Sequence, residues 1–122
     1  SPVEPARSAY QQTIELLESN GQLTGIFASN DEAAIAAIAA LHDRGLRVPD
    51  DVAITSIDDI ELASMIRPAL TTVNVPKRRM GTYAIQFLIS RREILSQHAA
   101  SMVLPIDLIV RDSCGARTQP GR

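Results

Sequence analysis

Cysteine and aromatic side chains are scarce in this chain of 122 residues. A single cysteine, Cys114, excludes an intrachain disulfide and fits a reducing compartment. Aromatic residues make up 3% of the sequence and tryptophan is absent, so Ile, Leu, Val and Ala must build the core. No apolar run approaches the roughly 20 residues that a membrane-spanning helix needs, and no signal peptide is visible. The single cysteine fits the cytosol, and we expect a cytoplasmic protein with no membrane partner.

The chain also lacks the charge pattern and the motifs of several functional classes. Its net charge is -2, which gives no electrostatic footprint for nucleic acid. We expect the short basic run at 77–79 to be a solvated helix face. His42 and His98 have no partner at metal-ligand spacing, and no P-loop, GxSxG, HExxH or GxGxxG pattern occurs. The sequence thus predicts no metal, no cofactor and no enzymatic activity.

Apolar periodicity predicts strands that alternate with helices. Tyr10, Ile14 and Leu17 recur at the spacing of one helix face, whereas LTTVNV at 70–75 is rich in β-branched residues. Helices are predicted at 8–18, 29–44 and 76–93, with a short turn at 62–66, and strands at 23–28, 52–57, 70–75 and 102–110. Such alternation is typical of right-handed βαβ units. We expect an α/β fold with three α/β/α layers and a mostly parallel sheet.

Polar residues follow two of these strands. Ser29-Asn30-Asp31 comes after the first strand, and Asp58-Asp59 ends the second. The carboxyl ends of parallel strands share one edge of a sheet, which is where open α/β sheets bind ligands. Two structural alternatives remain. The first group fits a helix cap, with a capping box that begins at Ser29, and the second fits a turn held by Asx hydrogen bonds.

Four segments match one family in order and in spacing: IFASNDEAAIAAIAAL, RGLRVPDDVAITSIDD, RPALTTVNVPKRRMG and LPIDLIVRDS. Over residues 10–113 the chain resembles the effector-binding domain of LacI/GalR-type bacterial transcriptional regulators, whose fold is periplasmic-binding-protein-like. The resemblance implies an incomplete domain. Residues 1–73 correspond to its C-terminal subdomain, 76–101 to a helix and loop of its N-terminal subdomain, and 102–111 to a returning strand. The polar residues 112–122 are expected to form a flexible tail.

The resemblance also implies roles for individual residues. The aspartate of the family motif commonly contacts a sugar or nucleobase effector, and it corresponds to Asp31 without a gap. Asn30 then orients this carboxylate or contacts the effector. Asp58 lies at the edge of the cleft, where it either touches the effector or holds the crossover between subdomains. Pattern alone favours capping for Asp31, whereas the resemblance favours effector binding.

By the same resemblance, the chain is the sensing part of a repressor. A small effector, most often a sugar or sugar derivative, shifts two subdomains and so alters the DNA affinity of a headpiece without counterpart here. A homodimer is implied, with Ile14, Met65 and Ile66 at its interface. A periplasmic sugar-binding component of a transporter is the first alternative. The second is a small α/β hydrolytic enzyme with Asp31 and Asp58 as an acid–base pair, although no nucleophile accompanies them.

Overall fold

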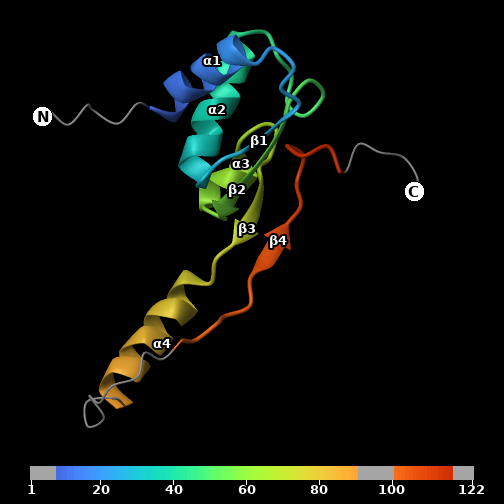
Figure 1. Cartoon of the computed structure of the whole chain (residues 1–122). Helices are drawn as coiled ribbons and strands as arrows, with labels where there is room; N and C mark the ends of the chain where they lie inside the picture. Colours follow the sequence, from blue (N-terminus) through green and yellow to red (C-terminus); the bar gives the residue numbers. More distant parts are fainter. Residues whose placement is uncertain (1–7, 91–100, 117–122) are drawn as a thin grey trace, which may run out of the picture.

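The computed structural model describes residues 8–90 and 101–116, which form a body and an elongated arm (Figure 1). The helices are α1 (Ala9–Ser19), α2 (Asp31–Asp43), α3 (Glu61–Met65) and α4 (Lys77–Ser90). The strands are β1 (Gly25–Phe27), β2 (Ala53–Asp58), β3 (Thr71–Asn74) and β4 (Asp107–Ile109). The predicted order of elements is confirmed, although β4 is much shorter than the strand predicted at 102–110. The helix end predicted at 91–93, the loop at 96–100 and His98 lie outside the described residues.

Side chains and one glycine set the ends of the two long helices of the body. Ser8 is the N-cap of α1, and its side chain accepts the Gln11 amide. The capping box predicted from Ser29 is wrong, because Asn30 is the N-cap of α2 and its Oδ1 accepts the Ala33 amide at 2.8 Å. Beyond the end of α2, Gly45 has a φ of 73°, a left-handed conformation that glycine adopts without steric cost.

The sheet has the order β1-β2-β3-β4. The first two pairings are parallel, with Phe27 beside Thr55 and Asp58 beside Asn74. The third is antiparallel and places Asn74 opposite Asp107. The predicted mostly parallel sheet is therefore confirmed, and the carboxyl ends of β1, β2 and β3 meet at one edge.

The core lies between α2 and the sheet. Ala34, Ala37 and Leu41 of α2 are buried together with Ile54 of β2, and small alanine side chains allow the helix to approach the strands closely. Burying a branched apolar side chain stabilises the fold by about 1.5–3 kcal/mol. The helix α1 packs against α2 in turn. The α/β class is confirmed, while helical layers on both faces of the sheet stay a prediction.

Residues 75–90 and 101–106 form the arm, which carries α4 away from the body (Figure 1). No residue of α4 is buried. A groove of about 210 Å³ runs between α4 and the returning segment, and it is lined by Met80, Tyr83, Ala84, Phe87, Met102 and Leu104. The apolar face predicted for α4 therefore lacks a covering layer within the described residues.

Residues 112–116 are docked on the sheet, so the flexible tail predicted for 112–122 is wrong in this part. Ser113 is fully buried. Its Oγ donates to the carbonyl oxygen of Ile54 at 2.6 Å and accepts the Thr71 amide at 2.9 Å, which links β2 to the start of β3. A lone serine in a polar segment shows no sequence pattern for such a role. Residues 117–122 lie outside the described residues.

Candidate effector site

Three strands end at one edge of the sheet, and each brings a polar residue there. Asn30 and Asp31 follow β1, Asp58 closes β2 and Asn74 closes β3. Parallel pairing keeps these ends in register, with Asp58 beside Asn74. The residues predicted from two separate segments are thus brought to one edge, the position at which open α/β sheets bind ligands.

Asp31 is fully buried and joins three segments. Its Oδ1 accepts hydrogen bonds from the hydroxyls of Ser56 and Thr72, each at 2.5 Å, and its Oδ2 accepts the Ile60 amide at 2.8 Å. A buried carboxylate needs such donors, because burying it unpaired is costly. Both oxygens therefore serve the protein itself, and an effector would reach Asp31 only if this cluster opened. The direct effector contact of Asp31 stays a prediction.

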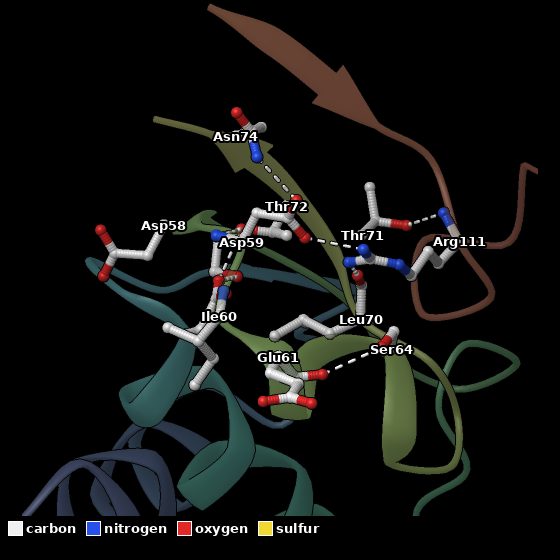
Figure 2. Close-up of polar contacts among 12 residues, drawn as sticks. Asp58, Asp59, Ile60, Glu61, Ser64, Leu70, Thr71, Thr72, Asn74 and Arg111 are labelled. Carbon is white, nitrogen blue, oxygen red and sulfur yellow. Dashed lines mark hydrogen bonds and ion pairs between the residues drawn. The ribbon is translucent and has the colours of Figure 1, made fainter. Parts of the chain in front are cut away.

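Asp58 is the carboxylate that faces away from this cluster. Figure 2 shows its side chain pointing away from the other labelled residues. Its backbone oxygen accepts a hydrogen bond from Nζ of Lys77. The φ of Asp58 is 134°, a conformation that costs a residue with a side chain roughly 1–3 kcal/mol. Strain of this kind persists at functional sites, so the geometry favours Asp58 as a ligand contact.

Asp59, the next residue, is tied to distant partners (Figure 2). Nη2 of Arg111 donates to its Oδ1 at 2.7 Å, and Nδ2 of Asn74 donates to its Oδ2 at 2.8 Å. Burial alone would raise the pKa of Asp59, but the hydrogen bonds from Asn74 and Arg111 outweigh burial and hold the pKa below its ordinary value. These long-range partners hold the turn, in place of the predicted Asx hydrogen bonds.

Sequence reasoning missed the donors around both aspartates. Ser56, Thr72 and Arg111 lie 25, 41 and 52 residues from the aspartates they contact, so no local spacing reveals the pairs. One signal was present in the sequence. Ser56 and Thr72 are polar residues inside apolar strands, and a buried hydroxyl requires a hydrogen-bond partner.

The residues predicted for the dimer interface lie on α1 and around the end of α3. Ile14 and Ile66 are half-buried, whereas Met65 is 63% exposed. Ile66 packs against the core, so Met65 offers more of its side chain to a partner. The dimer role of all three stays a prediction. The basic run at 77–79 is exposed, as predicted, and so is His42.

Within residues 8–90 and 101–116, no group of three or more His, Cys, Asp and Glu side chains is placed to hold a metal ion. None of the helices in this part is both long and apolar enough to span a bilayer. Cys114 is half-buried and accepts a hydrogen bond from the Thr71 hydroxyl at 3.2 Å, a contact that serves packing on the sheet.

Known proteins are similar to this chain in sequence and in fold. A sequence profile of periplasmic binding protein-like domains matches residues 2–114. The HTH-type transcriptional repressor PurR of Aliivibrio fischeri is 35% identical over 104 residues, which are 85% of this chain and 31% of that repressor. The chain thus spans about a third of the length of this relative.

Two solved structures match most of the chain. One is a LacI family transcriptional regulator from Enterococcus faecium with bound ribose, with a TM-score of 0.74 and 33% identity, covering 87% of this chain and 39% of that one. The other is the lac repressor dimer bound to operator and the anti-inducer ONPF, with a TM-score of 0.77 and 29% identity, covering 87% and 37%. The likeness therefore extends over both the body and the arm.

Proposed function

Because this chain belongs to the family of periplasmic binding protein-like domains, in the form found in LacI-type regulators, we propose that it is the sensing part of a transcriptional repressor. The edge that carries Asp58 binds a small effector, a sugar or sugar derivative. Binding changes the DNA affinity of a headpiece outside this chain. The effector must bind one arrangement of the subdomains better than the other, since equal affinity for both would switch nothing.

The observation that carries this proposal is the outward-facing carboxylate of Asp58. It stands at the carboxyl edge of three strands, and its backbone is held in a strained conformation. A carboxylate accepts directional hydrogen bonds from two neighbouring hydroxyls, which suits a neutral sugar. Asn30 stands at the same edge, and its Oδ1 already caps α2, so its amide nitrogen is the group offered to an effector.

Asp31 supports the same site in one of two ways. As predicted, it contacts the effector directly, which requires its buried cluster to open. In the arrangement described above, Asp31 accepts the Ile60 amide and so holds the loop after β2, which fixes the position of Asp58 two residues earlier. The two roles differ in one measurable way, because only the first makes effector affinity depend on the charge of Asp31.

The relatives support a homodimeric regulator. The PurR relative is a repressor, and the lac repressor neighbour is a dimer bound to operator. We infer that the protein containing this chain is a cytoplasmic homodimer with Ile14, Met65 and Ile66 at its interface. A two-fold dimer suits operators with two half-sites, which the headpieces read.

A periplasmic sugar-binding component of a transporter is the second candidate, because it would have the same fold. The likeness to repressors over most of this chain favours the sensing role. The hydrolytic alternative needs Asp31 and Asp58 as an acid–base pair. The complete burial of Asp31 weighs against that pairing.

A thermal-shift screen of the full-length protein against sugars, sugar phosphates and purines tests the proposal. We expect at least one compound, with D-ribose included in the set, to raise the melting temperature of the wild type and not of Asp58→Ala. Asp50→Ala removes a carboxylate that is 57% exposed elsewhere on the body, so this matched control keeps the shift. An equal shift in wild type and Asp58→Ala would remove Asp58 from the site.

Asp31→Asn, run in the same screen, separates the two roles of Asp31. The substitution keeps the side-chain shape and one acceptor oxygen but removes the charge. A bracing role predicts a lower melting temperature without effector and a preserved shift with it. A direct contact predicts that the shift itself is lost.

A further inference from the structure

The turn that ends β2 is strained at two successive residues. The φ angles of Asp58 and Asp59 are 134° and 54°, and neither residue is glycine. Positive φ at a residue with a side chain persists only where the surroundings over-determine it. The contacts of this turn should therefore include at least one strong and rigid anchor.

The anchors differ in strength. Lys77 contacts the Asp58 carbonyl oxygen, but it is exposed at the start of α4. The Asp59 amide reaches the Thr72 hydroxyl at 3.4 Å, a long contact. The Arg111–Asp59 ion pair is different. Its N···O distance is 2.7 Å, and the two side chains are only 16% and 17% exposed, so water screens it little.

Arg111 is itself held in place. Its Nη1 donates to the Leu70 carbonyl oxygen at 2.8 Å, and its backbone amide donates to the Thr71 hydroxyl at 2.9 Å. Two residues later, Ser113 is buried against β2 and β3. The guanidinium is planar and offers several donors in a fixed geometry, so it transmits the position of β3 to Asp59. Figure 2 shows Arg111 reaching across to Asp59.

We propose that Arg111 is a positioning residue for effector binding. Through Asp59 it holds the strained turn in the one conformation that aims the Asp58 carboxylate outward at the edge. This inference rests on the proposed function, since it gives Asp58 its role as the effector contact. It also assigns a purpose to an ion pair formed across 52 residues of sequence.

Hydrogen–deuterium exchange of the full-length protein, without any effector, tests this role. The Ile60 amide is bonded to Asp31, so peptides that cover the turn report whether it stays closed. We expect Arg111→Met to raise exchange in the segment 58–62 at least tenfold. Exchange in α2, where Leu41 is fully buried, stays within twofold of wild type. Arg111→Lys keeps the positive charge but loses the planar guanidinium with its several donors. Exchange of the turn in this variant should lie between that of wild type and that of Arg111→Met.

Arg44→Met is the matched control. It removes an arginine–carboxylate pair with a similar N···O distance of 2.8 Å, but the two side chains are 42% and 62% exposed and the pair joins the C-cap of α2 to α1 in the body. We expect turn exchange at the wild-type rate in this variant. Unchanged turn exchange in Arg111→Met would overturn the proposal, and so would an equal rise in the turn and in α2, which marks a general loss of stability.

The outcome is separable from that of the thermal screen, because no effector is present here. Faster turn exchange in Arg111→Met, together with an effector shift unaffected by Asp58→Ala, would reject the turn as the effector site. Arg111 would then lose its role in binding as well. An unchanged turn beside an Asp58-dependent shift would reject the role of Arg111 alone and leave the effector site in place.

Discussion

The body and the arm both carry many apolar side chains, but only the body buries them. Leu41, Ile54 and Leu70 of the body are fully buried. In the arm, Leu88 and Ile89 are 72% and 70% exposed, and Val103 is 90% exposed. In the body, α2 packs on the sheet and α1 packs on α2, so a core is enclosed. In the arm, one helix and one extended segment cannot enclose a core. The contrast teaches that an amphipathic pattern identifies the apolar face of a helix. It does not show that the same chain provides the surface against which that face packs.

The largest expected contrast is between two leucines. Leu41→Ala in the body should lower the free energy of unfolding by about 3 kcal/mol, because it leaves a cavity in a packed core. Leu88→Ala in the arm should change it by no more than about 0.5 kcal/mol. Urea denaturation of both variants measures the two values. Equal losses would mean that the arm is packed as tightly as the body.

The exposed arm should also make the 122-residue chain associate. Apolar side chains of this size seldom stay open to water, so we expect a dimer or larger oligomer, formed by exchange or pairing of the arms. Leu88→Glu combined with Ile89→Glu should weaken association at least tenfold, or about 1.4 kcal/mol. Sedimentation velocity across a concentration series measures it.

Phe27→Glu is the control for this association. Phe27 lies on β1 of the body and is 64% exposed, so an exposed apolar side chain is replaced by glutamate outside the arm and outside the proposed dimer interface. Association of this variant should match the wild type. A wild-type chain that is monomeric at every concentration would contradict the prediction.

The smallest effect concerns the turn at Asp58 and Asp59, which contacts Asn74 at the end of β3 and Arg111 just after β4, the two strands that lead to the arm. The pKa of Asp59 is lowered, so its stabilising effect is complete above the unfolded-state pKa of about 3.9 and is lost as the pH falls through the folded value. Asp59→Asn should therefore melt below wild type at pH 7, and the gap should shrink below about pH 4. Melting temperatures at several pH values measure the gap. A gap independent of pH would show that the ion pair with Arg111 does not stabilise the fold.

Asp51 offers a comparison within the body. Its hydrogen bonds with Arg47 lower the pKa of this carboxyl to about 2. The same sign holds, so its contribution is present above about pH 4 and disappears toward pH 2. Asp51→Asn should thus reduce the pH dependence of the melting temperature in the same acid range. It should leave hydrogen exchange in the turn at Asp58 unchanged, which separates the effect of a surface ion pair from the effect of the turn.

Local patterns predicted the elements, and long-range contacts decided the site. Periodicity and turn residues were enough to place the helices and three of the strands, because those signals act within a few residues. The burial of Asp31 was beyond such reasoning, since its donors come from β2, β3 and the loop between them. Ser113 and Arg111 likewise contact residues that lie at least forty positions earlier in the chain.

The arm is inserted between two strands that pair with each other. Asn74 and Asp107 face each other across β3 and β4, which are adjacent and antiparallel. Residues 75–106 are therefore, in topological terms, the loop of a single enlarged β-hairpin. A hairpin loop does not determine the order of the strands beside it. The register of the sheet edge that carries Asp58 is thus set by the pairing of β2 with β3 and of β3 with β4, and not by the length of that loop.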